Sequence, residues 1–217
     1  GGGDVQGIHM VTVPKNDAIT MLVQPNGQLG FDLAGSANVV NGNVVLSAGR
    51  NIIGGQIDPT GGYAGNADSS VAVDGGRFTS DVTVRAKTDA LAASETATPE
   101  FLGDVTLQAA GRALLAGRQA GQTLTVGGDA TLIGDGTVTG GAAPTTTGGT
   151  VSIFTDNGGS VAITGDVLMT TDVIAASSTT GSSARGGQAL IRAIGGTIDI
   201  DGSVTLSSNA IGGATGP

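Results

Sequence analysis

Three stretches of the sequence follow one pattern: TLTVGGDATLIG from Thr123, SVAITGDVLMTT from Ser160 and TIDIDGSVTLSS from Thr197. Their starting points lie 37 residues apart, 160 − 123 and 197 − 160. Aligned, they keep the same residue character at the same places, in the columns Leu124, Val161, Ile198; Val126, Ile163, Ile200; Gly128, Gly165, Gly202; and Leu132, Met169, Leu206. Self-similarity at a fixed period indicates an array in which each unit buries its apolar face against the next.

Within one copy, apolar residues alternate with polar ones over short runs, such as residues 160–163 and 166–169, as half-buried strands require. Gly165 lies between these runs, where we expect a positive φ and room for the neighbouring coil. A third run, residues 150–155 and again 188–193, slips by one residue against the period. The pattern therefore leaves open whether Leu190 or Ile191 points inward.

Three short strands per turn, each stacked on its counterpart, predict an all-β parallel β-helix, a solenoid. At roughly 30 to 37 residues per coil, the chain predicts about six coils. No stretch has the composition of a linker, so residues 1–217 are expected to form a single β-helix segment. The chain opens and stops within its own repeat pattern, and we expect it to be a fragment of a longer repeat protein.

The composition narrows the classes of protein. Glycine makes up 40 of 217 residues without a three-residue period, and 39% of residues are hydrophobic, which excludes collagen and disorder. Aromatic residues are only 2%, so we expect a core of Val, Ile, Leu and Ala. A net charge of −9 makes nucleic acid an improbable partner, and the absence of Cys excludes disulfides and thiolate catalysis. No apolar run is long enough to span a bilayer.

Four spacers rich in small and polar residues are predicted to be surface loops: residues 58–68, 89–100, 140–148 and 176–186. The last two occupy the same phase of successive repeats, so they should leave the coil along one edge. Stacked loops are where a solenoid most readily binds a partner, although tolerated insertions without a partner remain the alternative.

Two phrases carry a family resemblance: NVVLSAGRNI at residues 43–52 and GDVTLQAAGR at residues 103–112. They resemble the repeats of filamentous haemagglutinin-type exoproteins, which are long bacterial adhesins of the two-partner secretion type. The phrase QPNGQLGF at residues 24–31 also resembles the Asn-Pro-Asn-Gly motif of their secretion domain, with Gln24 in place of the first Asn. Its alternative interpretation is a Pro-Asn-Gly turn between two strands.

The resemblance implies a right-handed β-helical shaft that is secreted or anchored at the surface of a Gram-negative bacterium. It further implies adhesion to an unidentified host or bacterial surface receptor or glycan, passage through an outer-membrane transporter, and no enzymatic activity in the shaft. Metal ions, cofactors and membrane-spanning segments are not expected in it.

Few residues are candidates for chemistry. His9 is the only histidine, so it would have to serve any histidine-dependent triad, and an exposed strand residue is the simpler interpretation. Asp199 and Asp201 alternate with Ile198 and Ile200, so both carboxylates should project from one outer face, as a solvated surface, a calcium contact or an acid-base pair. The sequence predicts no catalytic, cofactor-binding or metal-binding residues.

Short polar residues also recur at the period, in the columns Asp129, Asp166, Ser203 and Asp135, Asp172, Asn209. We expect their side chains to bond backbone N–H groups at stacked turns, with calcium bridging as the alternative. Arg50, Arg112 and Arg192 are expected to pair with Asp side chains of adjacent coils at the surface.

The leading hypothesis for function is therefore a non-catalytic structural or adhesive shaft that presents loops on one edge. The alternative is a carbohydrate-active β-helix, a polysaccharide lyase or hydrolase, although Tyr63 and four Phe offer few platforms for sugar rings. A flat-surface binder of the ice-binding kind would need matched Thr columns, but Thr131 meets Leu168 in the next copy.

Overall fold

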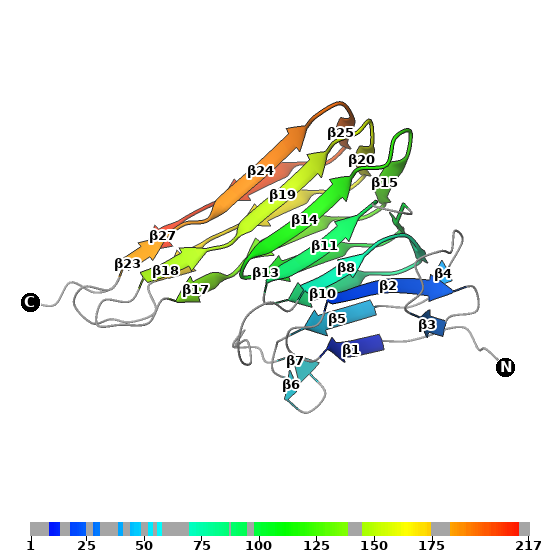
Figure 1. Cartoon of the computed structure of the whole chain (residues 1–217). Helices are drawn as coiled ribbons and strands as arrows, with labels where there is room; N and C mark the ends of the chain where they lie inside the picture. Colours follow the sequence, from blue (N-terminus) through cyan, green and yellow to red (C-terminus); the bar gives the residue numbers. More distant parts are fainter. Residues whose placement is uncertain are drawn as a thin grey trace, which may run out of the picture.

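A computed structural model gives the fold of the chain (Figure 1). It describes the backbone at residues 9–13, 18–24, 28–30, 39–40, 44–48, 52–53, 56–57, 70–86, 88–94, 98–138, 145–174 and 183–212, and the side chains of these residues from 72 onward except 137–138. The described residues form short strands and contain no helix. Most strands lie in three parallel sheets, which is consistent with a parallel β-helix.

The first sheet has seven parallel strands. Along the sheet they are β1 (His9–Val13), β5 (Val44–Ala48), β10 (Val82–Ala86), β13 (Val105–Ala109), β16 (Ala130–Gly134), β21 (Val167–Thr170) and β26 (Val204–Ser207).

The second sheet has seven strands, six of them parallel. They are β24 (Gln188–Ala193), β19 (Thr150–Thr155), β14 (Arg112–Gly117), β11 (Asp89–Ala93), β8 (Ser70–Val73), β2 (Ala18–Gln24) and β3 (Gln28–Gly30), and β3 pairs antiparallel with β2.

The third sheet has six parallel strands. They are β25 (Thr197–Ile200), β20 (Ser160–Ile163), β15 (Thr123–Val126), β12 (Glu100–Phe101), β9 (Arg77–Phe78) and β4 (Val39–Val40).

Small sheets lie beside these. They comprise β17 (Gly136–Val138), β18 (Thr145–Gly148) and β23 (Ser183–Arg185); β22 (Val173–Ile174) and β27 (Ala210–Ile211); and β6 (Ile52–Ile53) with β7 (Gln56–Ile57).

The chain visits the three main sheets in turn. From β10 it passes to β11 and β12, and then returns to the first sheet at β13, next to the strand it left. The 37-residue register predicted from the sequence is confirmed, because Thr123 pairs with Ser160 and Ser160 pairs with Thr197. The slipped run is resolved too. Thr150 pairs with Gln188, which places Ile191 over the buried Ile153 and leaves Leu190 exposed.

The coils are not all of the predicted length. Val82 pairs with Val105 and Val105 pairs with Ala130, so these coils take only 23 (105 − 82) and 25 (130 − 105) residues. The later coils are longer because residues are inserted between the first and second sheets. The step from β13 to β14 takes 7 residues (112 − 105), whereas the equivalent step from β16 to β19 takes 20 (150 − 130).

The predicted spacers are in part strands. Residues 89–100 were expected to be a loop, but they include β11, whose Ala90 and Ala92 are fully buried in the core. Alternating small residues line the narrow interior without a bulky side chain, which is why the sequence pattern resembles a loop. The spacers 140–148 and 176–186 contain β18 and β23, and the spacer 58–68 lies outside the described residues.

The core consists of inward side chains stacked in columns, mostly Val, Leu, Ile and Ala as predicted. Aromatic residues contribute more than the composition suggested. Phe78 and Phe101 are fully buried on neighbouring coils, and their rings stack with centroids 5.1 Å apart. Their column continues as Val126, Ile163 and Ile200 on later strands and as Val40 on the strand before, so the two rings stand in register with aliphatic residues on both sides.

Candidate functional site

A continuous ladder of carboxylates lies where the chain turns from the third sheet into the first, a feature we call the Gly-Asp corner. Each Asp accepts a hydrogen bond from the backbone N–H one coil further on. The bonds run from Asp104 N to Asp81 Oδ1 (3.0 Å), Asp129 N to Asp104 Oδ1 (2.9 Å), Asp166 N to Asp129 Oδ1 (2.8 Å) and Ser203 N to Asp166 Oδ1 (2.8 Å). The backbone-bonding interpretation of this column is confirmed, and the ladder extends upstream to coils that the 37-residue alignment did not include.

A glycine precedes every ladder residue after Asp81, and it is required by space rather than by dihedral angle. Gly128, Gly165 and Gly202 do not have positive φ, so that part of the prediction is wrong. A Cβ on Gly165 would lie 2.6 Å from the Gly128 carbonyl oxygen and would clash with the Asp129 carboxylate. The glycine therefore lets each coil come close enough to bond the carboxylate beneath it.

In the second polar column, Asp135, Asp172 and Asn209, the last step is joined by hydrogen bonds. Asn209 N donates to Asp172 Oδ1 (2.6 Å), and Ser207 Oγ donates to both Asp172 oxygens (2.7 and 2.8 Å). The Asn209 N–H first, and then the Ser207 hydroxyl, hold the pKa of Asp172 below its ordinary value of 3.8, because they stabilise the charged carboxylate. Asp135 instead accepts from Gln108 Nε2 (2.8 Å).

The outer faces of the sheets differ in chemistry. On the first sheet, Thr83, Thr106 and Thr131 stack on consecutive strands before Leu168 interrupts the column. The first sheet therefore has a column of three Thr residues. Only Thr131 of these lies in the three aligned sequence copies, so the comparison of those copies did not reveal the column. On the second sheet the outer face carries an apolar cluster, in which Leu91 and Phe154 pack against the buried Ala93, Leu114 and Ala116.

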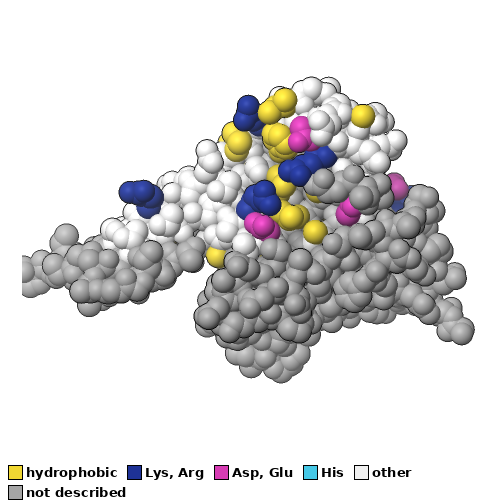
Figure 2. Space-filling model, in the orientation of Figure 1, with side chains coloured by type: hydrophobic (Ala, Val, Ile, Leu, Met, Phe, Trp, Pro, Cys, Tyr) yellow, Lys and Arg dark blue, Asp and Glu magenta, His cyan; other side chains and the backbone are white. Residues whose placement is uncertain are grey.

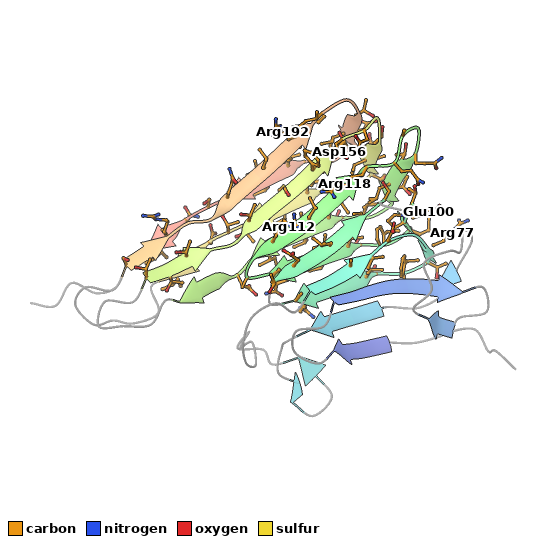
Figure 3. The ribbon with its side chains drawn as sticks, in the orientation of Figure 1. Arg77, Glu100, Arg112, Arg118, Asp156 and Arg192 are labelled. Carbon is orange, nitrogen blue, oxygen red and sulfur yellow. The ribbon has the colours of Figure 1, made fainter. Side chains whose placement is uncertain are left out.

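Arginines border that apolar face (Figures 2 and 3). The Arg118 guanidinium lies 5.9 Å from the centroid of the Phe154 ring, within cation–π range. Arg112 pairs with Asp89 of the previous coil at 3.4 Å, as the sequence predicted for this residue. For Arg192, which projects from β24, no ion pair with another described residue is present.

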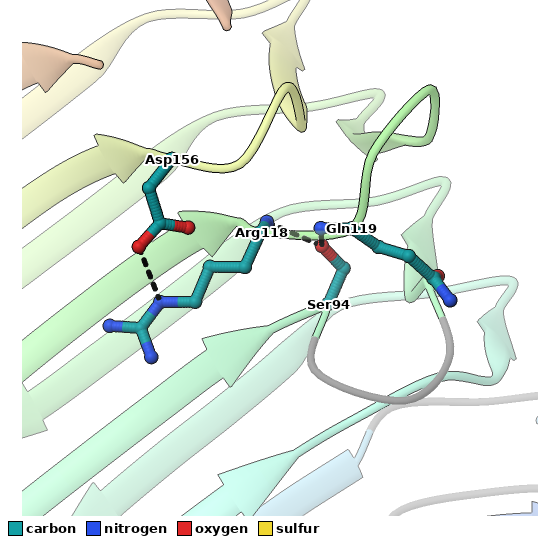
Figure 4. Close-up of polar contacts among 4 residues, drawn as sticks. All are labelled: Ser94, Arg118, Gln119 and Asp156. Atoms are coloured by element: carbon teal, nitrogen blue, oxygen red, sulfur yellow. Dashed lines mark hydrogen bonds and ion pairs between the residues drawn. The ribbon is translucent and has the colours of Figure 1, made fainter. Parts of the chain in front are cut away.

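A polar group occupies the corner between the second and third sheets (Figure 4). The fully buried Ser94 Oγ accepts from Arg118 N (2.8 Å) and Gln119 N (3.2 Å), which ties two coils together. Arg118 Nε lies 3.9 Å from Asp156 Oδ2 of the following coil. These contacts link three successive coils, and no signal in the sequence singled them out.

The strands β17, β18 and β23 form a small sheet at the side of the coil, which we call the lateral edge. β18 pairs parallel with β23, with Thr145 in register with Ser183, so both insertions leave the coil at the same place, as predicted. These strands extend outward from the main sheets (Figure 1). A shallow hollow beside them is lined by Asp172, Val173, Ile174, Asn209, Ala210 and Ile211. Ile174 and Ile211 are paired and exposed there.

The remaining candidates stay apart from one another. Asp199 and Asp201 are exposed on the outer face, while Ile198 and Ile200 pack against the core, as alternation predicted. His9 lies in β1, and Arg50 lies outside the described residues. In the part of the chain that the structure describes, no three His, Cys, Asp or Glu side chains are grouped to hold a metal ion. None of the same residues forms a helix that could cross a membrane.

Residues 25–27 lie outside the described residues, but the strands on either side of them pair antiparallel, Gln24 with Gln28 and Leu22 with Gly30. The pairing of β2 with β3 agrees with the alternative in which the strands on either side of this phrase lie next to each other. Comparison of the chain with family models, curated proteins and solved structures gives no match.

Proposed function

We propose that the chain is a structural and adhesive shaft segment of a secreted or surface-anchored bacterial β-helical adhesin. In this proposal the three sheets close into a right-handed solenoid of about six coils. The observation that supports it best is the ladder at the Gly-Asp corner, where four successive hydrogen bonds join neighbouring coils. Such uniform coil-to-coil bonding suits a rod that holds other parts of a protein at a distance.

Adhesive specificity is assigned to the lateral edge. The coil that contains β13 and β14 passes from the first to the second sheet through Ala110 and Gly111 alone. A coil can therefore stack on its neighbours without an insertion. The insertions add strands that are not part of the three main sheets, and loops on a rigid scaffold are common binding sites. The partner proposed is a protein or glycan on a host or bacterial surface, reached after export through an outer-membrane transporter.

A deletion that preserves the coil tests this assignment. Register matches Asp135 to Ala110 and Gly149 to Gly111, and Gly149 N already donates to the Asp135 carbonyl oxygen (3.1 Å). Removing residues 136–148 therefore joins neighbouring residues, and removing residues 173–186 joins Asp172 to Gly187, whose N–H donates to the Thr171 carbonyl oxygen (3.3 Å). We expect the shortened chain to keep its far-UV circular dichroism spectrum but to lose binding to cells and glycan arrays.

Two results would contradict the proposal. Binding that survives the double deletion would move the adhesive surface elsewhere on the coil. Turnover of an acidic or neutral polysaccharide by the intact chain would favour the carbohydrate-active alternative over the shaft hypothesis. The same activity should then be measured on the shortened chain.

A further inference from the structure

The small sheet at the lateral edge continues the second sheet outward, strand for strand (Figure 1). β23 leads into β24, and β18 leads into β19, with two residues and one residue between them. Gly136 of β17 is the partner of Gly148. Two residues further along the same line, Thr150 is the partner of Arg112 of β14. β17 therefore occupies the place that an outward extension of β14 would take.

The strand position next to β17 is open in the part of the chain that the structure describes. The order β17-β18-β23 places β17 at the border that faces the earlier coils, and β18 is its one described partner. The coil that contains β11 would supply the next strand, but its step from Val82 to Asp89 takes only 7 residues (89 − 82). The opening therefore belongs to the middle coils and does not depend on where the sequence begins or stops.

The open edge of β17 offers backbone groups rather than charged or aromatic side chains. Alternate residues of a strand direct their N–H and C=O groups to opposite edges, so some of these groups in β17 face the open position. Neither Lys nor Pro, which commonly protect an edge strand, is present in β17. Residues 136–148 contain no charged and no aromatic residue, so they provide neither an ionic partner nor a platform for a sugar ring. Such an edge suits an extended peptide.

We propose that an extended segment of a partner protein binds in this open position and pairs with β17 as an added strand. The inference rests on the adhesive role proposed for the lateral edge, and it narrows the partner from a protein or glycan to a peptide strand. The inner end of the segment lies beside Thr88, whose carbonyl oxygen accepts from Arg112 N (2.7 Å) where the line of β11 begins. Because the contact is not ionic, we expect the affinity to change little with salt concentration.

Peptides selected from a displayed library of random sequences test the pairing without changing the protein. Selection on the intact chain gives the probes, and fluorescence anisotropy measures their affinity. Methylating the backbone nitrogens of alternate peptide residues removes the donors that face β17, and we expect the affinity to fall by about tenfold or more. Methylating the intervening residues, whose N–H groups point away from β17, is the matched control and should have little effect.

A variant that fills the open position with the chain's own sequence tests the location. Register matches residues 87–88 to Ala110 and Gly111, and these match Asp135 and Gly149. A second copy of residues 136–148 between residues 87 and 88 therefore places the copied β18 beside β17. We expect this covered variant to keep its circular dichroism spectrum and to bind the selected peptides about tenfold more weakly or less. The same insertion with Pro in place of the copied strand's Thr residues cannot pair and should bind normally.

The outcomes separate this inference from the adhesive role itself. A library that yields no binding peptide, equal affinity after methylation in either register, or full peptide binding by a folded covered variant would each overturn the strand pairing. If the double deletion abolishes binding to cells but the covered variant still binds them, the lateral edge is adhesive and the strand pairing is wrong. If cell binding survives the double deletion while the covered variant loses the selected peptides, the strand pairing stands without the adhesive role.

Discussion

The two glycine-containing corners of the coil achieve sharp turns by different physical means. At the Gly-Asp corner, Gly165 does not have positive φ but has no room for a Cβ. At the corner between the second and third sheets, Gly121 has a φ of 70° and nothing within 4 Å of a Cβ position. One glycine is required by contact with the neighbouring coil and the other by its own backbone. Gly165 sets how closely the coils stack, whereas Gly121 reverses the direction of the chain.

The largest effect should follow from crowding the Gly-Asp corner. Gly165→Ala places a methyl group against the Gly128 backbone and the Asp129 carboxylate, so the coils must move apart and the ladder must open. We expect a loss of about 3 kcal/mol in the free energy of unfolding, measured by urea denaturation. Gly212→Ala, where a Cβ meets nothing, is the control. Equal stability of the two variants would show that coil contact does not require the glycine.

The buried hydroxyl at the other corner should have the next largest effect. Ser94→Ala leaves the N–H groups of Arg118 and Gln119 without their acceptor, and we expect a loss of about 2 kcal/mol. Ser152→Ala, a hydroxyl removed from the outer face of β19, serves as the control and should cost less. A wild-type urea midpoint for Ser94→Ala would mean that this corner is not held by the hydroxyl.

Removing one step of the ladder distinguishes hydrogen bonding from charge. Asp129→Ala deprives Asp166 N of its acceptor at an exposed site, so we expect a loss of about 1 to 1.5 kcal/mol. Asp129→Asn keeps an acceptor oxygen and should stay near wild type in the same denaturation experiment. If Asn proved as destabilising as Ala, the carboxylate charge rather than the acceptor would be the source of stability.

A methyl group at the roomy glycine should cost less. Gly121→Ala must place an L-residue at positive φ, which we expect to cost about 1 kcal/mol without any clash. Gly121→Asn should cost less still, because Asn tolerates this conformation, and Asn157 already adopts a φ of 51°. If Gly121→Asn proved less stable than Gly121→Ala, the positive φ would not be the reason for a glycine at this corner.

The smallest effect is the dependence of stability on acid. Because Asn209 and Ser207 lower the folded-state pKa of Asp172, its stabilisation is complete above the ordinary value of 3.8. It is lost as the pH falls through the lowered pKa. Asp172→Asn should therefore flatten the decline of thermal stability below pH 3.8 relative to wild type, measured by circular dichroism. An unchanged slope would show that the carboxylate does not contribute.

Sequence reasoning worked where a side chain repeats at constant spacing. The column Leu124, Val161, Ile198 and the ladder step from Asp129 to Asp166 follow from the 37-residue period, because residues at the same phase stack directly. It did not work for β11, an Ala-rich strand in a shorter coil that does not share the 37-residue period of the three copies. It also did not find Ser94, since a single buried hydroxyl leaves no pattern.

The sequence by itself therefore determined the strand register of the first and third sheets in the last coils, together with their inward columns, because periodicity is local information repeated along the chain. Only the tertiary structure decided why Gly165 must be glycine and that Ile191 rather than Leu190 faces inward. Those properties depend on distances between coils, and such distances are set when residues far apart in sequence pack against one another.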